Sequence, residues 1–404
     1  MRRKSAASLF GACARRRVCL EASDCPIALK VTDCANLPAG CKGRIGAQGE
    51  GAELTDAANQ GGVNHSPRLF QLDALRGLAA MAIMLFHLDL VYRIHGPFVR
   101  GYLFVDMFFL LSGFVLAVST ERKLKAGIGA LAFTRDRFVR LWPLVAVGAG
   151  VATARAFAIG MADPLTLLLW LALDLAMIPS FSGTGPFYRY NGPQWTLFYE
   201  LLANFLHALV LRKVPTRWML ALALALGVAL IVTVRMHGSD TMGVDAPTWD
   251  TWWMGLPRVG WSYVLGVWMG RKYKDGVRGP ALPWWLTLAL PVVAIALVPR
   301  LPLRVAHGDL VFVMGFLPLA VWAVAQSRPP KALKPAFEWF GNYSLPLYCV
   351  HLTVLVWISE LLGRAAWVQA TAVGAAMLLA FVFSRLISFK GRPTRGKPDL
   401  APTG

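Results

Sequence analysis

The chain alternates between long apolar runs and short polar or basic connectors from Leu69 to Phe389. A helix needs roughly 20 apolar residues to cross the hydrocarbon core of a bilayer, and ten runs approach or reach that length. The pattern therefore predicts an all-α fold, a polytopic membrane helix bundle with about ten transmembrane helices. The predicted spans are 69–92, 102–119, 138–158, 194–212, 217–235, 256–270, 283–299, 308–326, 340–361 and 366–388.

An eleventh apolar run, 164–179, is shorter than the others. It is about five turns long, begins at Pro164, ends at Pro179 and contains Asp174. We predict that it forms a re-entrant or interfacial helix and does not cross the membrane.

The distribution of basic residues predicts the orientation, because connectors rich in Lys and Arg stay in the cytoplasm. Basic residues gather in five segments: 122–140, 212–217, 271–278, 328–334 and 390–397. All five fall on one side only if the run 164–179 does not cross. The sequence therefore predicts ten crossings with both termini in the cytoplasm.

The two ends of the chain differ from this pattern. Residues 1–65 hold five of the six cysteines but no run long enough to cross a bilayer. The cysteine spacings lack the paired C-x₂-C arrangement of a zinc site, so no metal site is expected there. We interpret 1–65 as a disordered extension or the product of an upstream start codon, 66–390 as the transmembrane domain, and 391–404 as a short basic cytoplasmic tail.

Composition narrows the class of protein. Lys and Arg number 41 against 22 Asp and Glu, which gives a formal net charge of +19. A basic balance often indicates nucleic-acid binding, but such proteins carry many charges on a water-soluble surface. Here 56% of the residues are hydrophobic and only 16% are charged. The composition therefore indicates an integral membrane protein in the lipid bilayer, with no nucleic-acid partner.

Two ionisable residues share one face of the first span. Arg76 and His87 are eleven residues apart, which places them within about 20° of each other around a helix and about 16 Å apart along it. Each alone has an ordinary interpretation: an arginine that reaches the inner interface, and a histidine bonded to a backbone carbonyl. The aligned pair is a candidate catalytic feature, because charges inside a membrane usually face a bundle interior or a wet cavity.

Glu200 lies about six residues from the outer end of the span 194–212, close to the predicted depth of His87. A carboxylate and an imidazole at one depth suggest a base with an orienting or charge-stabilising partner. The alternative is that Glu200 pairs with Arg258. Further candidates for supporting roles are Asp106, Trp195 and His351, the last of which we expect to be a hydrogen-bonded histidine of the bundle.

Arg137 and Arg140 lie one turn apart at the start of the span 138–158. Such a pair can hold a phosphate through several donors, which suits a nucleotide-bearing cofactor. The alternative is an ordinary positive-inside anchor.

Five segments, taken together and in order over about residues 68–389, resemble the membrane-bound acyltransferase-3 family, which acylates bacterial surface and secreted carbohydrates. The segments are Leu72-Asp-Ala-Leu-Arg76-Gly-Leu-Ala-Ala with His87, Phe104-Val-Asp106-Met-Phe-Phe-Leu-Leu-Ser112-Gly113-Phe114, Arg137-Phe-Val-Arg140-Leu-Trp-Pro143, Gln194-Trp195-Thr-Leu-Phe-Tyr-Glu200 and Gly341-Asn-Tyr-Ser344-Leu-Pro-Leu-Tyr348-Cys-Val-His351.

The resemblance implies a multi-pass protein of the bacterial inner membrane, with acyl-CoA (acetyl-CoA expected) as the cytoplasmic donor and no metal. It also implies a hydroxyl of a carbohydrate or glycolipid as the acceptor at the outer side. In the family the histidine matching His87 is usually assigned as the base, and the arginine matching Arg76 is important. The arginines matching Arg137 and Arg140 are associated with the CoA end.

The combined hypothesis is that Glu200 orients His87 or stabilises its cation, while Arg76 lines the donor channel or stabilises the oxyanion. A polytopic transporter remains an alternative, as does an inactive member of the family. A glycosyltransferase that uses a lipid-linked sugar is a third, and outer-loop carboxylates give it slight support: Asp240, Asp245 and Asp250.

Overall fold

The computed structural model describes residues 68–180, 185–237, 242 and 247–387. Several predictions lie outside the described residues: those for 1–65 and 391–404, and those for Asp240 and Asp245.

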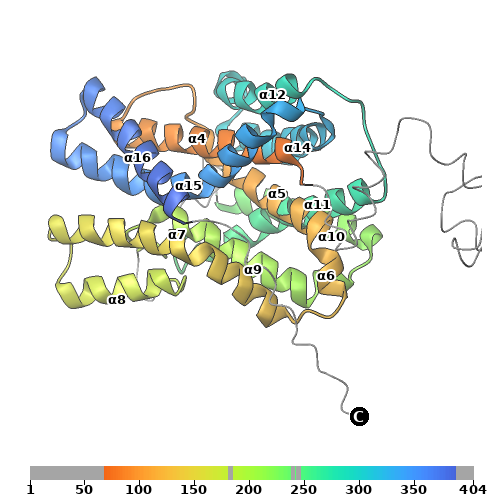
Figure 1. Ribbon diagram of the computed structural model, residues 1–404, viewed down its shortest axis with the longest axis horizontal. Helices are drawn as coiled ribbons and strands as arrows, with labels where there is room; N and C mark the ends of the chain where they lie inside the picture. The colour runs from red at the N-terminus through yellow and green to blue at the C-terminus, as the bar shows by residue number, and fades with distance from the viewer. Residues whose placement is uncertain (1–67, 181–184, 238–241, 243–246, 388–404) are drawn as a thin grey trace, which may run out of the picture. The chain divides into compact units, whose positions relative to one another are not determined.

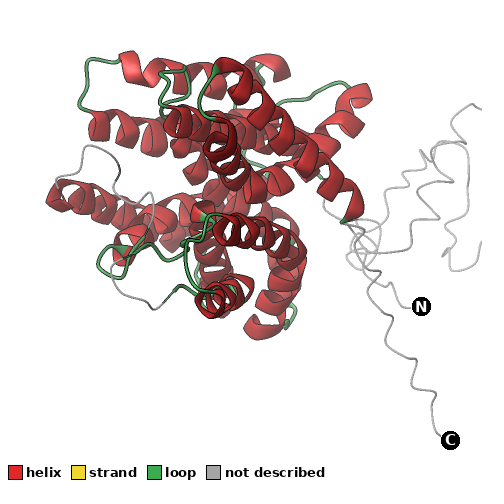
Figure 2. Ribbon diagram, turned by 90° about the vertical axis from the view of Figure 1, so that its left-hand side faces the viewer, coloured by secondary structure: helices red, strands yellow, loops and turns green. Residues whose placement is uncertain are grey.

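The described chain is all-helical. Helices are joined by loops, and no strand occurs in the part of the chain that is described (Figure 2). Helices satisfy their own backbone hydrogen bonds, as a chain in lipid must. The predicted all-α fold class is confirmed.

Each of the ten predicted spans contains a helix. In chain order these are α4 (Phe70–Tyr92), η3 (Gly101–Leu103) with α5 (Phe104–Ser119), α7 (Ala130–Ala158), α9 (Trp195–Leu209), α10 (Thr216–His237), α11 (Trp252–Lys274), α12 (Trp284–Leu297) with η6 (Val298–Arg300), α13 (Val305–Val311) with the π-helical turn η7 (Phe312–Phe316) and α14 (Leu317–Gln326), α15 (Lys334–Leu362) and α16 (Ala366–Leu386). Short helical segments complete the described chain: α6 (Glu121–Lys125), α8 (Pro164–Leu175), η4 (Gly192–Gln194), η5 (Leu211–Lys213) and η8 (Lys331–Leu333).

Seven helical stretches of the described residues are long and apolar enough to cross a membrane: α4, η3–α5, α7, α10, α13–α14, η8–α15 and α16. Of the other three predicted spans, α9 has 15 residues and α12 has 14, while α11 has 23 residues and carries charges at Arg258 and Arg271. The count of ten crossings therefore stays a prediction. So does the non-crossing role of α8, which has 12 residues and packs against α7 (Figure 1).

Helices α5 and α11 approach each other through glycine (Figure 1). A Cβ atom on Gly266 would lie 2.1 Å from the Leu110 carbonyl oxygen, and one on Gly113 would lie 2.1 Å from that of Tyr263. Gly270 follows Gly266 by four residues, so both face α5. Small residues at this spacing allow membrane helices to pack backbone against backbone.

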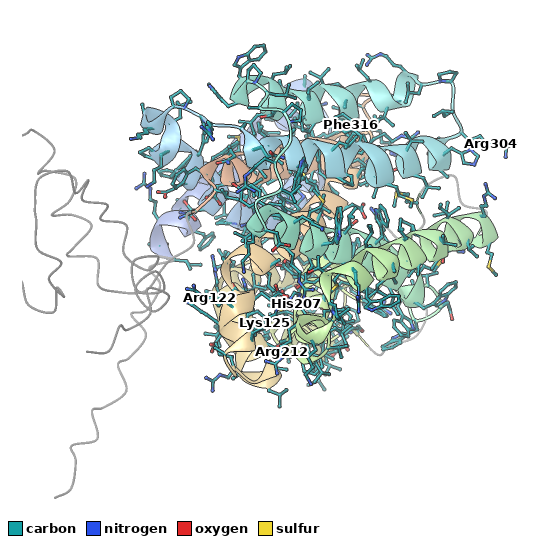
Figure 3. The ribbon with its side chains drawn as sticks, turned by 90° about the vertical axis from the view of Figure 1, so that its right-hand side faces the viewer. Arg122, Lys125, His207, Arg212, Arg304 and Phe316 are labelled. Atoms are coloured by element: carbon teal, nitrogen blue, oxygen red, sulfur yellow. The ribbon has the colours of Figure 1, made fainter. Side chains whose placement is uncertain are left out.

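A buried ionic joint ties the end of α11 to two connectors at one end of the bundle. Glu121 pairs with Arg271, which also donates to the carbonyl oxygens of Val214 and Leu211 at 2.6 and 3.0 Å. Figure 3 shows Arg122, Lys125, His207 and Arg212 near this end and Arg304 far from them. The connectors after α5 and after α9 therefore lie at the same end, as the predicted topology requires.

Candidate functional site

A cavity of about 430 Å³ opens between α4, α5, α7, α9 and α15. Four arginines line it against only two carboxylates, Asp73 and Glu200, so positive charge prevails. We call it the arginine cavity, after Arg68, Arg76, Arg137 and Arg140. Because Arg137 and Arg140 are three residues apart on α7, the helix repeat carries both to the same wall.

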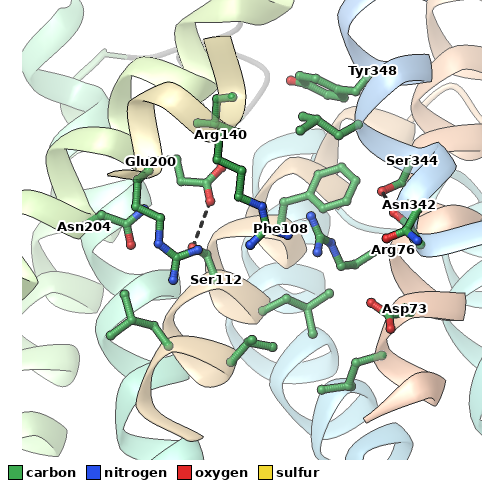
Figure 4. A pocket seen from close by; sticks show the side chains of 18 of the residues that line it. Asp73, Arg76, Phe108, Ser112, Arg140, Glu200, Asn204, Asn342, Ser344 and Tyr348 are labelled. Carbon is green, nitrogen blue, oxygen red and sulfur yellow. Dashed lines mark hydrogen bonds between the residues drawn. The ribbon is translucent and has the colours of Figure 1, made fainter. Parts of the chain in front are cut away.

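The arginines of this cavity differ in their partners. Arg68 donates to Asp73 at 2.7 Å and to Asn342 at 3.3 Å. Arg76, Arg137 and Arg140 form no hydrogen bond or ion pair within the described ranges. Figure 4 shows Arg76 and Arg140 projecting into the cavity from opposite walls. Unpaired cations at the mouth of an apolar bundle suit an anionic ligand with several acceptor oxygens.

Glu200 also lines the arginine cavity, where its carboxylate accepts a hydrogen bond from the Ser112 hydroxyl at 3.1 Å (Figure 4). No hydrogen bond joins it to His87 in the described chain. The structure therefore places Glu200 in the lining of the same cavity as Arg137 and Arg140, and its partnership with His87 stays a prediction.

His87 has a different partner. Its Nδ1 lies 3.1 Å from Nε2 of His351 and 3.0 Å from the Ile83 carbonyl oxygen. The predicted bundle histidine thus contacts the predicted base directly. We call the two residues the histidine pair.

The surrounding carbonyl groups assign the hydrogens of the histidine pair. Nδ1 of His351 lies 3.0 Å from the carbonyl oxygens of both Leu347 and Tyr348, which only accept, so this nitrogen carries the hydrogen. In the neutral ring Nε2 of His351 is then an acceptor, so Nδ1 of His87, which faces this nitrogen and the Ile83 carbonyl oxygen, carries the hydrogen that the two acceptors share. The remaining nitrogen of His87, Nε2, keeps its lone pair and can accept a proton.

Two aromatic rings at the edge of the arginine cavity, Tyr348 and Phe108, form what we call the aromatic wall. Tyr348 lines the cavity, and its ring centroid lies 5.8 Å from that of His351 and 5.8 Å from that of Phe108. The Tyr348 hydroxyl is 2.9 Å from Oγ1 of Thr196. His87 is not among the described residues that line the cavity. Of the two residues that share this face of α4, only Arg76 therefore lines the cavity, and their common interior stays a prediction.

Asp106 and Trp195 lie outside the arginine cavity. Asp106 is fully buried and accepts a hydrogen bond from Nη2 of Arg258 at 2.8 Å, while the Arg258 guanidinium carbon lies 5.9 Å from the centre of the Trp195 ring. This pair joins α5 to α11. Arg258 thus has Asp106 as its carboxylate partner, where the sequence also allowed Glu200.

Several residues of the cavity were not assigned a role from the sequence. Ser112, Ser344 and Tyr348 stood within quoted motifs, and Arg68 preceded the first of them. One signal in the sequence could have identified Ser112 as a cavity residue, because it is an isolated polar side chain inside the apolar run of the second span. Among the described residues no group of three or more His, Cys, Asp or Glu side chains is arranged to hold a metal ion.

A family model described as an acyltransferase domain matches residues 69–387, which include the histidine pair and every residue that lines the arginine cavity except Arg68. The chain belongs to the acyltransferase-3 family. The protein is therefore an acyltransferase by family, and the resemblance seen in the sequence is confirmed.

Three curated relatives of this acyltransferase-3 protein are informative. Acyltransferase MdmB of Streptomyces mycarofaciens is 26% identical over 80% of this chain and 89% of its own length. Protein 2 in the picA locus of Rhizobium radiobacter is 34% identical over 35% of this chain and 81% of its own length. The exopolysaccharide production protein ExoZ of Rhizobium meliloti (strain 1021) is 32% identical over 34% of this chain and 42% of its own length. No solved structure shows a significant match.

Proposed function

We propose that this protein transfers an acyl group, acetyl in the simplest case, from cytoplasmic acyl-CoA to a hydroxyl of a carbohydrate or glycolipid acceptor. The observation that carries the proposal is the arginine cavity with its three unpaired cations, next to a histidine pair that leaves one nitrogen free. We also propose residence in a bacterial inner membrane with both termini in the cytoplasm. The family membership supports acyl transfer, and the name of ExoZ supports a polysaccharide-related acceptor.

The donor would bind by its phosphates. Arg137 and Arg140 offer two guanidinium groups from one wall, and Arg76 offers a third from α4. Glu200 lies among them, bonded to Ser112, and its negative charge would hold the arginines in place when the cavity is empty. Its role is then to position the donor-binding arginines, and Arg76 lines the donor channel.

The chemical step would use His87. Its Nε2 removes the proton of the acceptor hydroxyl as the oxygen attacks the thioester carbonyl. The carbon–oxygen bond forms and the carbon–sulfur bond breaks, so the CoA thiolate leaves and takes the proton back from the imidazolium. His351 accepts from Nδ1 of His87 throughout, which fixes the ring and stabilises its cation, as the third member of a triad does.

The thioester would reach His87 only past the aromatic wall. Tyr348 and Phe108 line the arginine cavity, and the Tyr348 ring also contacts the His351 ring, so we propose that a rotation of these rings accompanies the reaction. Such gating movements are common in enzymes that close over their substrates.

The test is transfer of labelled acetyl from acetyl-CoA to the carbohydrate fraction of membranes that contain the protein. Wild-type membranes should incorporate label and release free CoA, and His87→Ala should lower the rate by about a hundredfold or more while the protein stays folded in detergent. Full activity of His87→Ala would remove that residue from the mechanism. Absence of both label transfer and acyl-CoA binding in the wild type would overturn the proposed function.

A further inference from the structure

A second basic pocket adjoins the arginine cavity. It has a volume of about 250 Å³ and lies where the start of α4 meets the connector between α14 and α15. Four cations line it, and no carboxylate does so among the described residues. We call it the rim pocket, after Arg68, Phe70, Arg328, Lys331 and Lys334.

The two hollows meet at Arg68, which lines both. Its side chain is 47% exposed and is held by Asp73 on the side of the arginine cavity. A ligand long enough to pass Arg68 can therefore occupy the rim pocket and the arginine cavity together.

The rim pocket has a fixed floor. The buried amide of Gln71 donates to the Ala325 carbonyl oxygen at 3.1 Å and so joins α4 to the end of α14. Pro329 and Pro330 stiffen the connector that follows. The positive-inside rule accounts for a basic connector, but it does not require a concave surface beside the arginine cavity.

The rim pocket also presents an aromatic ring. Nζ of Lys334 lies 4.4 Å from the ring centre of Phe70, so the ring is already in contact with a cation. A flat apolar face between cations is the combination that a nucleotide uses, because its base stacks while its phosphate takes charge-assisted hydrogen bonds.

We propose that the rim pocket binds the adenosine 3′-phosphate end of the acyl-CoA donor. The 3′-phosphate lies on Arg328 and Lys331, and the adenine lies against Phe70. The diphosphate then passes Arg68 into the arginine cavity. This inference rests on the proposed function, since it assigns the far end of the same donor.

The experiment compares the binding of CoA and 3′-dephospho-CoA to the purified full chain in nanodiscs of neutral phosphatidylcholine. The wild type should bind CoA about tenfold more tightly, because only CoA carries the 3′-phosphate. The double variant Arg328→Ala with Lys331→Ala should lose this preference and bind 3′-dephospho-CoA within about twofold of the wild type. The matched control, Lys272→Ala with Lys274→Ala, removes two charges from the last turn of α11, outside both pockets, and should keep the preference.

The outcomes separate the two proposals. Equal binding of both nucleotides by the wild type, or a preference that survives in Arg328→Ala with Lys331→Ala, overturns the rim-pocket assignment and leaves the donor cavity standing. Failure of the wild type to bind either nucleotide overturns the proposed function as well. A lipid headgroup offers the same phosphate chemistry, so binding of phosphatidylglycerol is measured in parallel. If the double variant loses only lipid binding, the pocket holds lipid and the nucleotide assignment is wrong.

Discussion

The hydrogen on Nδ1 of His351 determines which nitrogen of His87 is free to accept a proton. Two backbone carbonyls hold that hydrogen, so Nε2 of His351 accepts and Nε2 of His87 stays unprotonated. A helix supplies these carbonyls to any histidine of suitable rotamer, and the arrangement needs no carboxylate. The proposed base, His87, would therefore not need a hydrogen bond to Glu200.

A substitution at His351 tests this positioning role. His351→Ala should lower the rate of transfer by about a hundredfold and leave the affinity for CoA unchanged, because the histidine pair lies outside the arginine cavity. His351→Gln should recover part of the rate, since its amide oxygen can accept from Nδ1 of His87. Single-turnover rates and equilibrium binding measure the two effects separately. A parallel loss of CoA binding in both variants would indicate a purely structural role.

The arginines of α7 should act on binding. Arg137→Ala and Arg140→Ala should each raise the dissociation constant for acyl-CoA by about tenfold, because each removes charge-assisted hydrogen bonds to phosphate. Arg135→Ala is the matched control on the same helix, since Arg135 is exposed, pairs with Asp136 and does not line the cavity. Isothermal titration in detergent measures the affinities. If Arg137 and Arg140 are only topology anchors, all three variants will bind alike.

At the scale of the elements, the contact between α5 and α11 depends on glycine. Gly266→Ala places a Cβ atom 2.1 Å from the Leu110 carbonyl oxygen, so the two backbones must move apart. We expect a loss of about 2 kcal/mol or more in the free energy of unfolding. Gly150→Ala on α7 meets nothing within 4 Å and should leave stability equal or higher. Thermal unfolding in detergent compares the variants, and equal melting of both would contradict the close packing.

The ionic joint at the end of α11 should make stability depend on pH. Burial acts to raise the pKa of the Glu121 carboxyl, but its interactions with His207 and Arg271 prevail and lower the pKa to about 2 from the usual 4.5. A lowered folded-state pKa stabilises the fold above about pH 4.5, and this stabilisation is lost as the pH falls towards 2.

The measurement is the melting temperature of the wild type and of Glu121→Gln between pH 6 and pH 3, a range chosen around the usual pKa of about 4.5. The advantage of the wild type should shrink as the pH falls through this range. An advantage that stays constant would show that the carboxylate of Glu121 contributes nothing through its charge.

At the scale of the whole molecule, the sequence was sufficient to predict the fold class and one wall of the arginine cavity, the wall that α7 forms. Apolar length predicts helices, and the spacing of Arg137 and Arg140 on one helix predicts their common wall. Partners on different helices were harder to predict. The depth of a residue in its span can be counted, but the direction it faces depends on how the helices pack. Glu200 and His87 share a predicted depth and still face different neighbours.

The same limit explains His351. It lies 264 residues from His87 in the chain, and nothing local in its helix distinguishes a histidine that contacts another histidine from one that contacts only carbonyls. The wall formed by Tyr348 and Phe108 was equally hidden, because its position depends on rings from two helices that meet only in the folded bundle.

The aromatic wall has a consequence for how long a bound acyl-CoA would survive without being hydrolysed. If the arginines hold a thioester as proposed, Tyr348 would keep it away from Nε2 of His87, the nitrogen of the histidine pair that could activate water. The bound donor would then be protected from hydrolysis until the rings turn. We expect that acyl-CoA can wait loaded from one side of the membrane until an acceptor arrives from the other.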